Sequence, residues 1–158
     1  MKQFYLILAI TFLFQFSFCQ NFEKLSKYEF KYVESYRTEK DVVLKCANYL
    51  FENPSDYEPF NRLTAVQYIM KWMEGTPDYY FEIGEREMDL TKGNSDLFGL
   101  YLAAMSKAII EHKGEKDLTA DEIYTKAETI LVNYCSDSNN NMKPTRAIKK
   151  IIRQHKSK

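Results

Sequence analysis

Apolar residues recur every three or four positions through most of the chain, which is the spacing of amphipathic helices. The clearest run follows Asn94, a favoured N-cap residue, and continues to about His112. Gly99 and several alanines keep the surface of this segment thin, so neighbouring helices can approach it closely. We therefore expect it to be the central helix, with a core-facing side made of Leu97, Leu100, Tyr101, Ala104, Met105, Ala108 and Ile109.

Two further helices are expected before Asn94. The first follows Thr38 as N-cap, with Asp41 in a variant of the capping box, and ends at residues 53–55. The second begins at Pro59, a residue favoured in the first turn, and ends at Gly75, which is placed for a left-handed C-cap. Their predicted apolar faces are, in order, Val43, Cys46, Ala47 and Leu50, and Leu63, Val66, Ile69, Met70 and Met73.

Two segments have weaker patterns. In residues 22–37, Tyr28, Phe30 and Tyr32 alternate like a strand, yet the same residues fit a helix loosely. We predict a helix there because the rest of the chain is helical. Residues 85–91 form a short predicted helix after an apolar connector at residues 79–83.

The C-terminal third contains two more helices. Thr119 and Glu122 form a capping box that starts one of them. A polar loop at residues 137–141 follows, and Pro144 is expected to open the last helix, with Ala147, Ile148, Ile151 and Ile152 on one side. The predicted fold is thus all-α, an irregular or orthogonal bundle of five to six helices.

The first 20 residues follow a different pattern. Lys2 precedes an apolar run at residues 4–14, and small residues lie just before Gln20. This order is typical of a secretory signal peptide. We expect residues 1–19 to be removed between Cys19 and Gln20, leaving residues 20–158 as a single helical domain. An uncleaved anchor and lipidation of Cys19 are the alternatives.

Cleavage implies that the protein is exported, to the periplasm or the extracellular space. No stable membrane span is then expected, because the apolar run is shorter than the roughly 20 residues that a spanning helix needs. The net charge does not indicate a charged partner. The chain has 22 Lys and Arg and 22 Asp and Glu, so no overall positive field attracts nucleic acid.

Two cysteines remain after cleavage, Cys46 and Cys135. An oxidising compartment would permit a disulfide between them, but both lie on apolar helical stripes, where free cysteine is simply a small hydrophobe. Neither a metal site nor a cofactor is expected, since the chain has no Cys-x-x-Cys and only two histidines, His112 and His155.

The sequence also lacks the common catalytic motifs of hydrolases, metalloproteases and nucleotide-binding enzymes. We interpret the carboxylates at residues 85–89 as a solvated face. The first interpretation is therefore a non-enzymatic protein that binds a protein or another envelope partner. The alternative is an unrecognised hydrolase with a site of Glu, Asp and Tyr, which would need a carboxylate of raised pKa in a pocket.

Two surfaces are candidates for binding. The first is an aromatic group at a helix end and the turn after it, since aromatic residues with a polar tip are favoured at interfaces; it contains Trp72, Tyr79, Tyr80 and Phe81. These side chains could instead close the end of the core. The second is the basic last helix, which could lie on an acidic partner or an anionic membrane; its candidate residues are Lys149, Lys150 and Arg153.

Several short phrases along the chain support a resemblance. They are Ala47-Asn48-Tyr49-Leu50, Lys71-Trp72-Met73, Gly75-Thr76-Pro77-Asp78-Tyr79 and Leu97-Phe98-Gly99-Leu100-Tyr101. Together they resemble uncharacterised small exported helical proteins of Bacteroidota, which implies a compartment and a fold but no chemistry. The order of Leu100-Tyr101-Leu102-Ala103-Ala104, a capped helix at Thr119 and Pro144 before a basic helix is similar, more weakly, to that of periplasmic immunity proteins of type VI secretion. This likeness implies an inhibitor of a delivered toxin.

Overall fold

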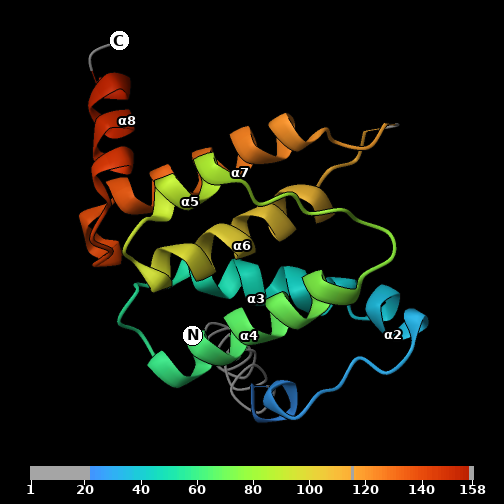
Figure 1. Cartoon of the computed structure of the whole chain (residues 1–158). Helices are drawn as coiled ribbons and strands as arrows, with labels where there is room; N and C mark the ends of the chain where they lie inside the picture. The colour runs from blue at the N-terminus through green and yellow to red at the C-terminus, as the bar shows by residue number, and fades with distance from the viewer. Residues whose placement is uncertain (1–21, 115, 157–158) are drawn as a thin grey trace, which may run out of the picture.

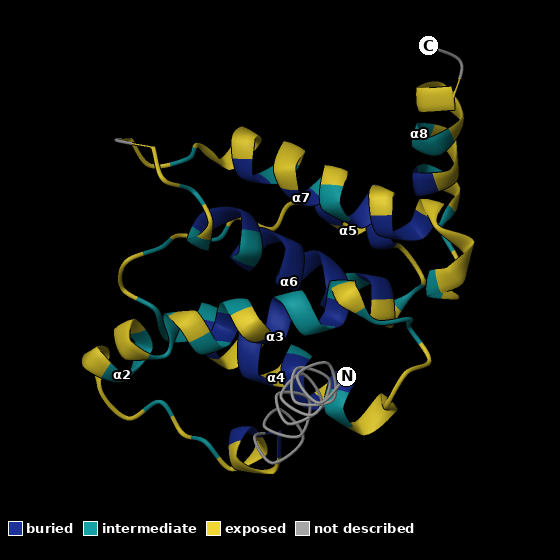
Figure 2. Cartoon of the chain, turned by 180° about the vertical axis from the view of Figure 1, so that it is seen from behind, coloured by how far each residue is buried: buried dark blue, intermediate teal, exposed yellow. Residues whose placement is uncertain are grey.

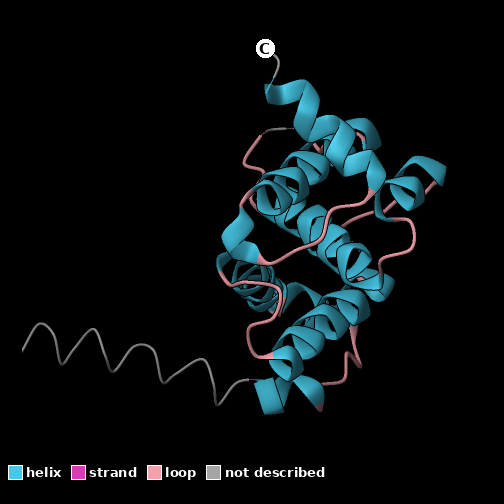
Figure 3. Cartoon of the chain, turned by 90° about the vertical axis from the view of Figure 1, so that its left-hand side faces the viewer, coloured by secondary structure: helices cyan, strands magenta, loops and turns pink. Residues whose placement is uncertain are grey.

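The computed structural model describes residues 22–114 and 116–156, and within them every regular element is a helix. The expected all-α class is therefore confirmed for this part of the chain, as Figure 3 shows. The predicted signal peptide and its cleavage site lie outside the described residues. The elements are α2 (Val33–Thr38), α3 (Lys40–Glu52), α4 (Pro59–Gly75), α5 (Glu85–Thr91), α6 (Ser95–Ile110), α7 (Ala120–Ser136), the 3-10 helix η1 (Ser138–Asn140) and α8 (Arg146–Lys156).

Helix α6 occupies the centre of the fold. It packs against α3, α4, α5 and α7 (Figure 1), and buried residues run along most of its length (Figure 2). The Asn94 side chain accepts hydrogen bonds from the backbone N–H groups of Asp96 and Leu97, both at 3.1 Å, as expected of an N-cap. All seven residues predicted to face the core are buried. The prediction of a central helix is confirmed, although the helix ends at Ile110.

Helix α4 crosses α6 at Gly99, and the contact requires a residue without a side chain at this position. A Cβ atom at Gly99 would lie 2.9 Å from Cγ1 of Val66, closer than carbon atoms pack. We expect Gly99→Ala to destabilise the protein by about 1 kcal/mol, because overpacking outweighs the higher helix propensity of alanine. In a Val66→Ala background the same change should be stabilising. Urea unfolding of the four variants measures the coupling, and equal effects in both backgrounds would contradict the contact.

Helix α3 has the predicted apolar face but not the predicted start. Val43, Cys46, Ala47 and Leu50 are all buried, and the helix ends at Glu52 as expected. Its N-cap is Glu39, however, and Thr38 is the last residue of α2. The Thr38 hydroxyl donates to carbonyl oxygens of its own helix rather than accepting from α3, so the predicted capping box is wrong.

Helix α4 begins at Pro59 as predicted, but its predicted apolar face is buried only in part: Ile69 is buried, and Val66 and Met73 are half-buried. Leu63 and Met70 are exposed, whereas the buried residues are Arg62, Thr64, Ala65, Tyr68, Ile69 and Trp72. Because this set includes polar residues, the spacing of apolar residues alone does not predict the core-facing side of α4. Gly75 remains helical instead of adopting a left-handed C-cap, and its missing side chain leaves room for the Tyr36 ring.

The predicted helix over residues 22–37 is interrupted. Residues 22–26 and 33–38 are helical, and the segment between them is not. This segment lays aromatic rings against α4: the centroids of Tyr28 and Phe30 lie 5.6 and 5.2 Å from that of Tyr68, and Phe30 stacks on Tyr36 at 4.7 Å. Contacts with another helix thus determine the backbone conformation of this segment. The spacing of apolar residues within the segment does not reveal such contacts.

The two C-terminal helices begin with side-chain caps. The reciprocal hydrogen bonds of Thr119 and Glu122 confirm the predicted capping box of α7. Helix α8 begins at Arg146 rather than at Pro144. The Thr145 hydroxyl accepts from the Ile148 N–H at 3.2 Å and donates to the carbonyl oxygen of Leu90 at 2.7 Å, so this residue both starts α8 and ties it to α5.

Candidate functional site

Positive charge is concentrated in helix α8 and the residues just before it. The last sixteen residues hold seven of the 22 Lys and Arg and no Asp or Glu, which leaves 15 basic against 22 acidic residues before Lys143, a net charge of −7. Within the described residues no carboxylate forms an ion pair with the cations of this segment, which are Lys143, Arg146, Lys149, Lys150, Arg153 and Lys156. All six are exposed.

The cations share one side of α8 because of their spacing. At 3.6 residues per turn, Arg146, Lys149, Lys150 and Arg153 fall on one face, and the isoleucines fall on the other. Ile148 is fully buried and the two later isoleucines are half-buried, where α8 packs against α5 and α7. The body of the protein thus occupies the apolar face, and the cationic face points away from it. In Figure 1, α8 extends from one end of the molecule. We call this surface the α8 cationic face.

The aromatic candidate surface is mostly core. Trp72 is completely buried, and its Nε1–H donates to the carbonyl oxygen of Tyr36 at 2.8 Å. Tyr79 and Phe81 are half-buried and pack on the Trp72 ring, with centroids 5.6 and 5.9 Å away. Tyr80, with 80% of its surface exposed, is the member that points to solvent. The proposed four-residue surface is therefore corrected: the connector folds back over the indole and buries it.

A shallow groove runs beside Tyr79 and Tyr80. Its volume is about 590 Å³, and His112 and Asp78 also line it. The Asp78 carboxylate is held by Arg37 at 3.0 Å, and a ring nitrogen of His112 lies 2.9 Å from the carbonyl oxygen of Lys116. Both of these polar groups already have partners within the described residues.

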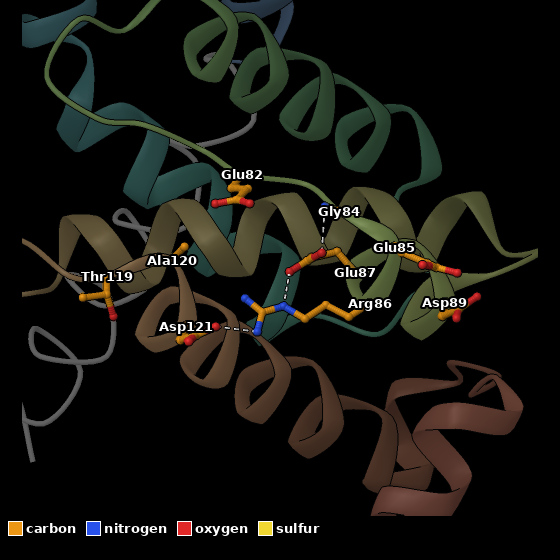
Figure 4. Close-up of a pocket in the computed structure, with 9 residues that line it drawn as sticks. All are labelled: Glu82, Gly84, Glu85, Arg86, Glu87, Asp89, Thr119, Ala120 and Asp121. Carbon is orange, nitrogen blue, oxygen red and sulfur yellow. Dashed lines mark hydrogen bonds and ion pairs between the residues drawn. The ribbon is translucent and has the colours of Figure 1, made fainter.

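A larger hollow of about 790 Å³ lies where α5 and α7 begin, and Arg86 stands at its centre (Figure 4). The Arg86 Nε lies 2.6 Å from Oε1 of Glu87, and its Nη1 lies 2.6 Å from Oδ1 of Asp121. The guanidinium also covers the ring of Tyr124, 4.2 Å from its centroid. Arg86 is thus shared by two helices and joins them at this corner.

Glu87 is 3% exposed, so the predicted solvated face over residues 85–89 is wrong at this position. Its Oε2 accepts from the Gly84 N–H at 2.7 Å, which gives the backbone donor of the N-cap residue of α5 a partner. Burial by itself would raise the pKa of the Glu87 carboxyl, but hydrogen bonds from Arg86 and from backbone N–H groups outweigh it and lower the pKa. This carboxylate remains ionised and structural.

A general acid or base at neutral pH needs a carboxyl whose pKa is raised. Among the described residues, the four carboxyls with a shifted pKa all move in the other direction. Hydrogen bonds from Lys27, Arg37 and Thr119 lower the pKa values of Glu23, Asp78 and Glu122, respectively, and Glu87 is the fourth. These groups give no support to the hydrolase alternative.

The lowered pKa of Glu87 makes a prediction about acid stability. Its stabilising effect is present above the unfolded value of 4.5 and is lost as the pH falls through the lower folded value. We expect Glu87→Gln to reduce the free energy of unfolding by about 1–3 kcal/mol at pH 7 and by less at pH 3. Urea unfolding at both pH values measures this, and an equal loss at pH 3 would show that the charge is not responsible.

Cys46 and Cys135 are both buried free thiols, on α3 and α7. Of the two alternatives left open by the sequence, the structure therefore shows the unbridged one. Burial raises the pKa of each thiol to about 12, so neither forms an appreciable amount of the reactive thiolate near neutral pH. Both act as small apolar residues of the core.

Neither a metal site nor a membrane span is found in the part of the chain that the structure describes. No group of three or more His, Cys, Asp or Glu side chains there could hold a metal ion. None of its helices combines the length and apolar character needed to cross a bilayer. The chain matches no family model, no curated protein and no solved structure closely enough to support an inference.

Proposed function

We propose that this chain is an exported, non-enzymatic protein, an irregular helical bundle that binds an acidic protein through the α8 cationic face. The observation that carries the proposal is that Arg146, Lys149, Lys150 and Arg153 share one exposed face and form no ion pair within the described residues. Elsewhere some cations are paired, as Arg37 is with Asp78, and Lys45, Lys71 and Lys126, which are unpaired in the same described part of the chain, lie on three different helices. A row of unpaired cations is an electrostatic surface for a partner of opposite charge.

The state of the isoleucines favours a protein over a membrane. A helix that lies on a bilayer buries its apolar face among the lipids. In α8 that face already packs on α5 and α7, and Ile148 is fully buried. Only the charged side is free, which suits a contact between charged surfaces.

The charge of the rest of the chain favours a protein over nucleic acid. Residues before Lys143 carry a net charge of −7, which repels an extended polyphosphate that follows the surface. A compact acidic patch on a protein meets α8 within a few ångströms, whereas the opposing charges of the body are screened beyond about 8–10 Å at physiological salt.

Binding to defined polyanions tests the proposal. The probes are poly-L-glutamate, vesicles that contain an anionic lipid, and double-stranded DNA, each titrated against the full chain at low and physiological salt. We expect poly-L-glutamate to bind most tightly and to weaken about tenfold or more as salt rises. Tighter binding to the vesicles or to DNA, or binding to poly-L-glutamate that salt does not weaken, would contradict the assignment.

A further inference from the structure

Arg62 is a buried cation at the start of α4. Its side chain is 8% exposed, and its Nη1 donates to the carbonyl oxygens of Leu50 at 3.0 Å and Asn53 at 3.2 Å. Its Nη2 makes a long contact of 3.5 Å with the hydroxyl of Tyr134. These bonds attach the C-terminal end of α3 to α4, where a positive charge also complements the helix dipole. They use one side of the guanidinium.

The other side of the guanidinium lacks a strong partner. The Nε–H and the neighbouring Nη2–H form an edge that binds a carboxylate side-on. Arg37 uses this same edge for Asp78, with Nε and Nη2 each 3.0 Å from a carboxylate oxygen. At Arg62, within the described residues, Nε has no acceptor and no carboxylate forms an ion pair. The guanidinium is bonded to carbonyl oxygens rather than to a counter-charge, and Nε is not among the buried polar atoms that lack a partner, so this edge is open to a carboxylate that enters from solvent.

A cavity of about 290 Å³ adjoins this arginine. Arg62 is one of its lining residues, and its walls are largely apolar, with Leu63, Val66, Leu100 and Met142 among them. The backbone of Gly99 also lines it. Small-molecule sites combine such apolar walls with a few polar groups that fix orientation.

The start of α6 contributes to the same cavity. Ser95, the first residue of this helix, is a lining residue. The Asn94 side chain already accepts from the N–H groups of Asp96 and Leu97, so the helix start contributes its dipole to the cavity rather than these donors. The acidic lining residue Asp96 is exposed, so water screens its repulsion of a bound anion. The buried arginine and the start of the helix both favour a ligand with a negative charge. The apolar walls favour a ligand with a hydrocarbon part.

From this arrangement we propose that the cavity binds a small carboxylate with a short apolar chain. The carboxylate pairs side-on with the Nε–Nη2 edge of Arg62, and the hydrocarbon lies between α4 and α6 beside Leu63 and Leu100. This site is separate from the α8 cationic face and does not depend on it.

Hexanoate and 1-hexanol test the proposal as a charged and a neutral probe of similar length. Each is titrated into the full chain while the methyl signals of Leu63, Leu100 and Met142 are followed by NMR. We expect saturable shifts with hexanoate and at least roughly tenfold weaker binding of 1-hexanol, because the alcohol lacks the charge-assisted bonds to Arg62. Equal affinities for the two probes would contradict the proposed preference for a carboxylate. The absence of saturable shifts would contradict the proposed binding site.

Substitutions at the exposed wall locate the binding without removing Arg62 from the fold. Leu63→Glu places a negative charge in the cavity and should weaken hexanoate about tenfold or more, whereas Leu63→Gln, of the same shape, should change it less than about threefold. Phe60→Glu is the matched control, because Phe60 is exposed on the same helix but does not line the cavity. A loss of hexanoate binding as large in Phe60→Glu as in Leu63→Glu would contradict the location.

Discussion

Replacing Lys149, Lys150 and Arg153 together by glutamate should abolish binding to poly-L-glutamate, with a loss of more than about 100-fold in affinity. The three side chains are exposed on the α8 cationic face and form no ion pair in the part of the chain that the structure describes, so the change removes attraction and adds repulsion at the point of contact. The isoleucines that hold α8 on the body are untouched. Thermal unfolding followed by circular dichroism should therefore shift little.

The matched control reverses the same number of charges elsewhere. Lys45, Lys71 and Lys126 are exposed residues of α3, α4 and α7, and none of them forms an ion pair within the described residues. The variant with glutamate at these three positions has the same net charge as the α8 variant. We expect it to retain most of the binding, because screening makes the contact local. A similar loss in both variants would mean that total charge, and not α8, controls binding.

Trp72→Ala should have the largest effect on stability, a loss of about 3–5 kcal/mol in the free energy of unfolding. The indole is fully buried, packs against the rings of Tyr79 and Phe81, and donates a hydrogen bond to the carbonyl oxygen of Tyr36. It therefore joins α4 to α2 and to the connector that follows α4. Urea unfolding measures the loss; Trp72→Phe should retain much of the packing and lose the hydrogen bond.

Tyr80→Ala is the control within the same aromatic group. Because Tyr80 is 80% exposed, its removal should change the free energy of unfolding by less than about 0.5 kcal/mol. If Tyr80→Ala unfolded the protein, or if Trp72→Ala were as stable as the wild type, the division of this group into core and surface would be incorrect.

The sequence predicts those helices best whose signals are local. Asn94 and Thr119 cap their helices through neighbouring residues, and the face of α6 consists almost entirely of apolar residues. The face of α4 could not be predicted in the same way, because Arg62 and Thr64 are polar and yet buried. Their burial depends on what α3 and α7 supply, such as the carbonyl oxygen of Leu50 that accepts from Arg62.

The same distinction between local signals and tertiary contacts applies to the candidate sites. The cations of α8 follow from their spacing in the sequence, but their lack of partners and the docking of the isoleucines depend on tertiary contacts. The sequence interpretation missed Arg62 altogether, since an arginine in the first turn of a helix is ordinarily solvated. For Trp72 it left two alternatives open, because aromatic residues around a helix end are consistent both with a binding patch and with a closed core.

Chemical-shift mapping of poly-L-glutamate on the ¹⁵N-labelled full chain tests the central claim most directly. We expect the shifts that change on titration to cluster in α8, at Arg146, Lys149, Lys150 and Arg153, and to reverse when salt is added. Changes that cluster instead at Tyr79 and Tyr80, or that spread evenly over the exposed lysines, would contradict the α8 cationic face as the binding surface.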